Sequence, residues 1–277
     1  MIKTIYINGC SWTAGHELDD MKNDSWPGQL ESLTGLEVIN EAMCGGSNHR
    51  ILRKTLKFLE KNKDRWNEIL VVPAWSCPSR NEFYEQGSQQ VYAKKFPELM
   101  EMGSLERNND EDWVWVNQYR ATSKDESVPN NVMAKYWYYA LESPETSYYN
   151  YIVDVLALQN FCKANGIKYY MFRAFQFENI ATPKHSWLGK YFRKYTQVSE
   201  YECEDIFREV ADRGNYEELI DLVDTKLFPS FIRSKGTIFN LSETPIGIHP
   251  DKKQCGTVAS KVKTILKEEG LIESIYS

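Results

Sequence analysis

The sequence predicts an α/β protein, a three-layer α/β/α sandwich built on a five-stranded, mainly parallel, flavodoxin-like sheet. Two observations support this class. Short apolar runs rich in β-branched and aromatic residues recur along the chain, and stretches with apolar residues at three-to-four spacing lie between them. An alternation of strands and helices is typical of a parallel sheet whose two faces are covered by helices.

Five apolar runs are the predicted strands, at residues 3–8, 37–40, 68–74, 167–172 and 237–240. Helical periodicity predicts helices at residues 26–33, 51–59, 151–164 and 258–266. Two intervals break the alternation, at about residues 80–150 and 176–235, and are predicted to be insertions in a single domain that spans residues 1–277. The first insertion is rich in tryptophan and tyrosine. It is either satellite core or a cap that stacks on sugar rings or on a partner protein.

Composition narrows the classes of function. The net charge of −6 and the pI near 5.4 argue against nucleic-acid binding, which needs a basic face to displace counterions. The N-terminus does not resemble a signal peptide, and no apolar stretch approaches the length of a membrane span, so we expect a cytoplasmic protein without a membrane partner. Six cysteines without CxxC spacing predict reduced thiols rather than disulfides.

Chemistry-bearing residues follow the predicted strands. Ser11 comes after the first, Asn48 lies in the loop after the second, Ser76 follows the third, and His249 precedes the last helix. Because ligands bind beyond the carboxyl ends of parallel strands, these residues are expected at one edge of the sheet. A serine and a histidine on neighbouring loops are what acyl transfer requires. The backbone N–H groups at the start of the helix that follows Ser11 would face an oxyanion formed there.

The chain resembles the SGNH (GDSL-type) esterase and lipase superfamily, and more narrowly its phage-encoded members. The resemblance rests on three motifs: Gly9-Cys10-Ser11-Trp12-Thr13-Ala14-Gly15, Asn40-x-Ala42-x-x-Gly45 and Gly247-Ile248-His249-Pro250. It implies that Ser11 is the nucleophile, that the N–H of Gly45 joins the oxyanion hole, and that His249 is the base. Trp12, beside the nucleophile, is a candidate substrate contact.

Two family residues are replaced in this chain. No asparagine follows the third strand at the family's position, so Ser76 or Asn48 is expected to supply the missing oxyanion donor. Ile246 stands where the family has the aspartate that orients the histidine, and Glu243 and Asp251 are the nearest acids in sequence.

Several other polar residues each have more than one expected role. Arg80 is expected to pair with Glu82 at the surface, to hold a substrate carboxylate or sulfate, or to brace the loop that carries Ser76. His16 and His49 are expected on the helices after the first two strands, as surface or supporting groups. Cysteines 10, 44 and 77 fall near strand ends, so a zinc site or a reactive thiol is an alternative, although no paired spacing supports a metal.

The sequence therefore predicts a serine esterase that hydrolyses an O-acyl or acetyl ester of a carbohydrate or another small polar molecule, with no metal and no organic cofactor. Ser11 would attack the carbonyl, and His249 would accept the serine proton. The alternative is a catalytically inactive SGNH-like binding module or virion-associated module, because the asparagine donor and the aspartate are both replaced.

Overall fold

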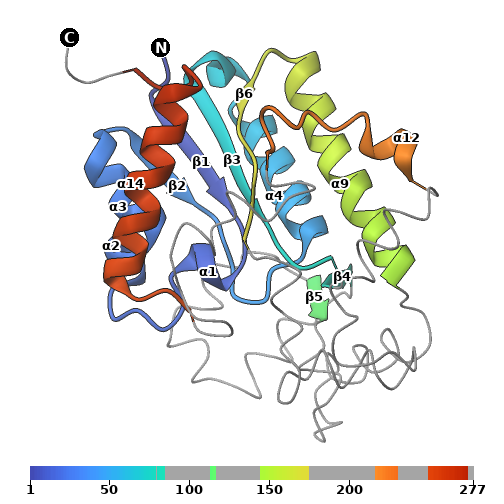
Figure 1. Cartoon of the computed structure of the whole chain (residues 1–277), viewed down its shortest axis with the longest axis horizontal. Coiled ribbons are helices and arrows are strands. Elements are labelled where there is room, and N and C mark those ends of the chain that lie inside the picture. Colours follow the sequence, from blue (N-terminus) through green and yellow to red (C-terminus); the bar gives the residue numbers. More distant parts are fainter. Residues whose placement is uncertain (79, 85–112, 117–143, 175–215, 230–248, 274–277) are drawn as a thin grey trace, which may run out of the picture.

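A parallel sheet of five strands lies at the centre of the computed structural model, which describes residues 1–78, 80–84, 113–116, 144–174, 216–229 and 249–273 (Figure 1). Its strands run in the order β2-β1-β3-β6, with β7 also paired to β3. The strands are β1 (Thr4–Asn8), β2 (Glu37–Asn40), β3 (Ile69–Trp75), β6 (Lys168–Tyr169) and β7 (Phe172–Arg173). Every pairing in this sheet is parallel, so the predicted fold class is confirmed.

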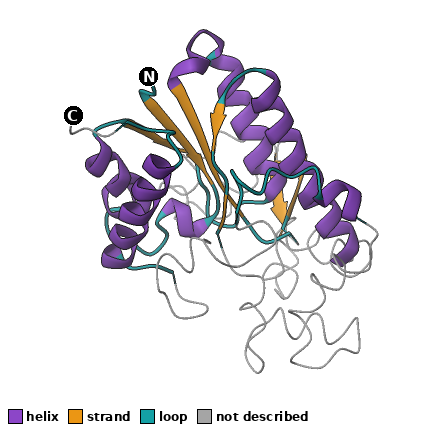
Figure 2. Cartoon of the chain, turned by 45° about the horizontal axis from the view of Figure 1, so that its top comes forward, coloured by secondary structure: helices purple, strands orange, loops and turns teal. Residues whose placement is uncertain are grey.

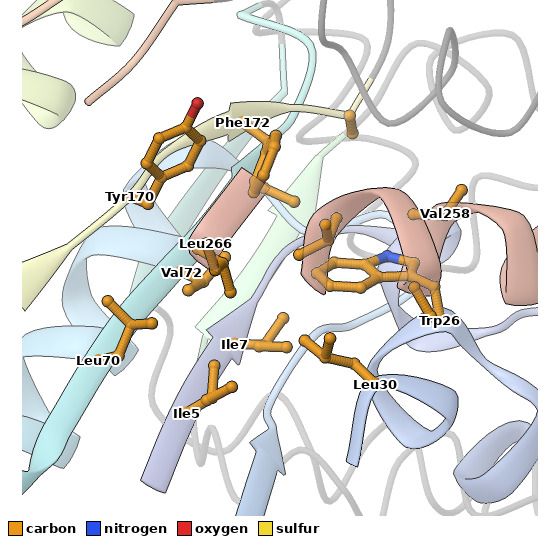
Figure 3. Packing of buried hydrophobic residues seen from close by; sticks show 14 of the residues in the cluster. Ile5, Ile7, Trp26, Leu30, Leu70, Val72, Tyr170, Phe172, Val258 and Leu266 are labelled. Atoms are coloured by element: carbon orange, nitrogen blue, oxygen red, sulfur yellow. The ribbon is translucent and has the colours of Figure 1, made fainter. Parts of the chain in front are cut away.

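Two helices cover one face of the sheet, α3 (Trp26–Thr34) and α14 (Lys252–Glu268). The short helix α2 (Met21–Asp24) packs on both of them. Alternate residues of β1 and β3 point to this face, because successive side chains of a strand lie on opposite sides. Figure 3 shows Ile5, Ile7, Leu70 and Val72 of these strands packed against the helices. The indole of Trp26 fills the space between α3 and the sheet and is fully buried.

Two long helices cover the other face of the sheet, α4 (Asn48–Lys61) and α9 (Pro144–Ala164) (Figure 2). The intervening strand residues, Tyr6 and Val71, pack here against Ile51 and Ile152. A 3-10 helix, η1 (Lys63–Glu68), leads into β3, and a short helix, α12 (Glu217–Ile220), lies beyond α9. The two buried clusters on opposite faces make the three layers predicted from the sequence.

Helix starts are fixed by side-chain caps. Ser25 Oγ accepts from Gly28 N at the start of α3, and Ser47 Oγ accepts from Arg50 N at 3.0 Å at the start of α4. Asp251 and Gln254 form a capping box at α14. Each cap satisfies an N–H that has no partner within its helix. Asp251, one of the two acids nearest to His249 in sequence, is therefore a helix cap.

Several predicted boundaries were wrong. Helices α4, α9 and α14 begin earlier than their apolar periodicity indicated, because their first turns are polar or lie outside the apolar stripe. Helix α9 begins at Pro144, inside the interval predicted as the first insertion. The run at residues 167–172 forms two short strands, β6 and β7, rather than one. The predicted strand at residues 237–240 lies outside the described residues.

A short hairpin lies in the interval predicted as the first insertion, ahead of α9. Strand β4 (Asn81–Tyr84) pairs antiparallel with β5 (Trp113–Val116). Glu82 ties it to α4, because its carboxylate accepts from Arg53 Nε at 2.8 Å and from Arg53 Nη2 at 3.0 Å. Glu82, which was predicted to pair with Arg80, therefore binds Arg53. Whether the insertion's aromatic residues form core or a cap stays a prediction, since most of them lie outside the described residues.

In the part of the chain that the structure describes, no helix is long and apolar enough to cross a membrane.

The packing of α3 on α14 gives a stability prediction. Leu30 is fully buried in this contact, whereas Leu33 on the same helix is 38% exposed. Leu30→Ala should lower the free energy of unfolding by about 2–5 kcal/mol, because it leaves a cavity in the core. The matched control Leu33→Ala should change it by about 0.5 kcal/mol or less. Urea denaturation measures both values, and equal losses would contradict the assigned face of α3.

Candidate active site

Ser11 lies at the carboxyl edge of the sheet, directly after the central strand β1 (Figure 1). It opens the short helix α1 (Ser11–Ala14), which ends at Gly15 with a left-handed φ of 78°. Ser11 is buried, with 5% of its surface exposed. A glycine is required two residues earlier, because a Cβ at Gly9 would lie 2.6 Å from Thr13 Oγ1 and 3.1 Å from the carbonyl oxygen of Ala74.

A buried polar network holds the turn that precedes Ser11. Asn8 Oδ1 accepts from Gly9 N at 2.8 Å and from Arg50 Nη1 at 3.3 Å, and its Nδ2 donates to Tyr6 Oη at 3.3 Å. Tyr6 in turn donates to a carboxylate oxygen of Glu41 at 2.8 Å. Burial, followed by the nearby Glu41 charge, raises the pKa of Tyr6 well above its ordinary value. Tyr6 therefore stays a donor.

The loop after β2 packs directly on the serine turn. Met43 N donates to the carbonyl oxygen of Gly9 at 3.1 Å. Gly46 N closes a turn on Met43 O at 3.0 Å, and Gly45 has the left-handed φ of 76° that the third residue of a type II turn requires. A Cβ at Gly46 would lie 2.9 Å from Gly9 O, so the backbones of the two loops are in direct contact and leave no room for a side chain there.

Two backbone N–H groups at this edge are available to a ligand. Among the hydrogen bonds of the described residues, none uses the N–H of Ser11 or the N–H of Gly45. These are the donors expected to hold an oxyanion. The loops that carry these two N–H groups adjoin, and their role as oxyanion donors stays a prediction.

The loop after β3 is held by Asn48 and Arg80. Asn48 Oδ1 accepts from Ser76 N at 2.7 Å, and Asn48 Nδ2 donates to Ser76 O at 3.2 Å. Arg80 Nη1 donates to Ser76 Oγ at 2.8 Å. Of the roles expected for Arg80, the structure shows the brace on Ser76. Asn48 and Ser76 bind each other, with one Nδ2 hydrogen of Asn48 left for another acceptor, and their part in an oxyanion hole stays a prediction.

His249 lies against the segment that carries Ser11. Its Nδ1 is 3.1 Å from Glu17 Oε2, its ring meets the ring of His16 edge-on at 5.1 Å, and the Trp12 ring lies at 6.2 Å. His16 is therefore a direct neighbour of the predicted base, in the turn after α1 rather than on that helix. No hydrogen bond joins Ser11 Oγ to His249 in the described part of the chain. In free enzymes this bond is often long and shortens when substrate binds.

The surroundings of His249 favour its neutral form. Burial lowers the pKa of His249, and the nearby His16 and Arg80 lower it further, while Glu17 opposes them. A base must be neutral to accept a proton, so a lowered pKa extends its useful range toward acid pH.

Sequence reasoning missed Glu17. It lies outside all three matching motifs, and its nearness to His249 arises only when the chain folds. Of the two acids expected near His249, Asp251 caps α14, and Glu243 lies outside the described residues together with Ile246.

A second histidine–carboxylate pair joins α4 to α9, where His49 Nδ1 lies 3.3 Å from Asp154 Oδ1. The cysteines predicted near the strand ends differ in environment, because residues 10 and 77 are buried and residue 44 is exposed. Within the described ranges, no group of three His, Cys, Asp or Glu side chains could hold a metal ion.

The chain belongs to a family of unknown function, DUF6071, whose model matches residues 16–191. The match includes Glu17, Gly45, Asn48 and Arg80 but ends before His249 and begins after Ser11. No curated protein matches the sequence.

Solved structures with a similar chain trace include the following three. One, from Desulfitobacterium hafniense DCB-2, is assigned to the G-D-S-L lipolytic family and has a TM-score of 0.42 and 12% identity, covering 95% of this chain and 99% of that chain. The psychrotrophic esterase EstA from a Pseudoalteromonas species has a TM-score of 0.43 and 10% identity, with coverages of 96% and 98%. The acetyl xylan esterase AlAXEase has a TM-score of 0.39 and 13% identity, with coverages of 94% and 98%.

The environment of His249 predicts opposite titrations for two histidines. The pKa of His249 should lie below the ordinary value of about 6.5, because burial disfavours the charged ring. The pKa of His49 should lie above it, because the hydrogen bond to Asp154 favours the charged ring. NMR titration of the histidine side chains measures both, with His249→Gln and His49→Gln assigning the signals. A pKa for His249 at or above that of His49 would contradict the described surroundings.

Proposed function

We propose that the protein hydrolyses a carboxylic ester through a covalent acyl-enzyme intermediate. The single observation that carries this proposal is that the His249 ring lies against the segment that begins with Ser11, at the sheet edge where two backbone N–H groups have no hydrogen-bond partner among the described residues. A nucleophile, a neutral base and oxyanion donors are the parts that acyl transfer needs.

In the proposed reaction, Ser11 Oγ attacks the ester carbonyl as His249 takes the hydroxyl proton. The N–H groups of Ser11 and Gly45 bind the negative oxygen of the tetrahedral intermediate. The intermediate collapses with loss of the alcohol, to which His249 returns the proton. Water then attacks the acyl-enzyme by the same route, releasing a carboxylic acid and restoring Ser11.

The substrate is an O-acyl or acetyl ester, with a carbohydrate as the proposed alcohol portion. The support for a carbohydrate is the aromatic cap predicted from the sequence, because Trp12, although its ring lies beside His249, is only 7% exposed and packs in the buried cluster on this face of the sheet. Arg80 and Asn48 would act through Ser76, which they hold in place. A cytoplasmic location and a phage origin stay predictions.

A fluorophosphonate probe tests the nucleophile. The intact protein should take up one probe, and it should hydrolyse p-nitrophenyl acetate. Ser11→Ala should lose the label and reduce kcat on the order of 10⁴-fold or more, because the acyl-enzyme can no longer form. Mass spectrometry locates the label. The control is Ser32→Ala, which changes an exposed serine of α3 and should alter neither readout.

Two results would contradict the proposal. Label that persists in Ser11→Ala, or that moves to Cys10, would assign the nucleophile elsewhere. A folded wild-type protein that neither reacts with the probe nor hydrolyses any short-chain ester would favour the inactive binding module or virion-associated module.

A further inference from the structure

We propose that Glu17 is the carboxylate that positions His249, supplied by the segment that carries the nucleophile instead of by the loop that precedes the histidine. This inference rests on the proposed esterase function. It assigns the position left open by Ile246 to a residue six places after Ser11 in the sequence.

The two atoms that meet in this contact lie within hydrogen-bonding distance. Glu17 Oε2 lies 3.1 Å from His249 Nδ1. A carboxylate can only accept, so the hydrogen must be on Nδ1. In a neutral ring this leaves Nε2 without a hydrogen and able to take the proton of Ser11. Glu17 thus selects the tautomer that the reaction needs.

The backbone of Glu17 indicates that its position is imposed by the fold. Its φ of 71° is the only left-handed value at a non-glycine residue in the described part of the chain. This conformation is unfavourable for a residue with a Cβ and persists where surrounding contacts determine it. Two hydrogen bonds hold the turn, from His16 N to Ser11 O at 3.1 Å and from Leu18 N to Gly15 O at 3.2 Å.

The other groups around His249 do not supply this contact. His16 meets the His249 ring edge-on and is not an acid, and Arg80 is a cation, so neither can supply a carboxylate. Asp251 accepts from Gln254 N at 2.8 Å as the cap of α14. Among the described residues, Glu17 is the carboxylate in ion-pair distance of the His249 ring.

In the reaction, Glu17 acts through His249 and takes no proton. When Ser11 transfers its proton to Nε2, the ring becomes an imidazolium whose Nδ1–H still donates to the Glu17 carboxylate. The negative charge stabilises the imidazolium until the proton passes to the leaving alcohol. The Glu17 side chain is 64% exposed, so water screens this charge, and its effect should be smaller than that of a buried aspartate.

Glu17→Gln tests the assignment because it keeps the shape and removes the charge. We expect kcat for p-nitrophenyl acetate to fall about 10- to 100-fold with KM nearly unchanged, below the ~10⁴-fold loss for a buried orienting aspartate. The pH profile of kcat/KM should shift its acid limb to lower pH, since loss of the carboxylate favours the neutral ring. Glu17→Asp should restore part of kcat. Glu60→Gln, at an exposed glutamate of α4, is the matched control and should change none of these values.

A second variant separates positioning from folding. Glu17→Gly relieves the left-handed backbone, so its melting temperature should not fall, yet its kcat should drop at least as far as that of Glu17→Gln. NMR of the His249 ring gives a readout independent of turnover. The Nδ1–H form should dominate in the neutral wild-type ring and lose its dominance in Glu17→Gln.

The outcomes distinguish the two proposals. If Ser11 reacts with the probe and Glu17→Gln keeps kcat within twofold with the same pH profile and the same tautomer, the role of Glu17 is wrong and the esterase proposal stands. If wild-type Ser11 does not react and no ester is hydrolysed, the esterase proposal fails, and the role of Glu17 fails with it.

Discussion

The buried amide of Asn8 is the interaction on which the candidate site depends. It stands at the end of the central strand and joins four neighbours, namely Tyr6, Gly9, Arg50 and the carbonyl oxygen of Ile51. A buried amide is stable only when such partners are present, and Arg50, also buried, needs its oxygen acceptors. The network therefore fixes where β1 stops and where the serine turn begins.

Close backbone contact then links the serine turn to the neighbouring loops. The carbonyl oxygen of Gly9 accepts from Met43 N, and the missing side chain at Gly46 lets the second loop reach it. Asn48 follows that loop and clamps Ser76 in the third. Because the three loops are bonded to one another, a shift of one would move the others. The positions of the Ser11 and Gly45 N–H groups therefore depend on all three loops.

Much of the fold was readable from local pattern. Apolar runs predicted β1, β2 and β3 to within a residue or two. The burial of β1 and β3 on both faces demands such runs, whereas β2 is only partly buried. The starts of α4 and α14 were missed because polar first turns carry no apolar period. The Asp251-x-x-Gln254 spacing of a capping box could have located the start of α14 and shown that Asp251 is a cap. The split into β6 and β7 follows from pairing with β3 along two stretches, which one sequence does not reveal.

The rule that parallel strands end at one edge predicted that Ser11 and His249 lie close together, and the structure places the His249 ring beside the segment that Ser11 begins. The roles of Ser11, Gly45 and His249 came from the family resemblance and stay predictions. Glu17 could not be named in advance, because its carboxylate meets His249 across more than two hundred residues of sequence and through an unusual backbone angle. No sequence motif predicts a left-handed φ at a residue other than glycine. Contacts between residues so far apart in sequence become visible only in the folded structure.

The most direct test of the account is a crystal structure of the protein after reaction with an alkyl fluorophosphonate. The account predicts phosphorus bonded to Ser11 Oγ and the phosphoryl oxygen about 2.7–3.1 Å from both the Ser11 and the Gly45 nitrogens, the spacing of an oxyanion hole. His249 should remain beside the adduct with Nδ1 on Glu17. An adduct on another residue, or a phosphoryl oxygen turned away from Gly45, would contradict it.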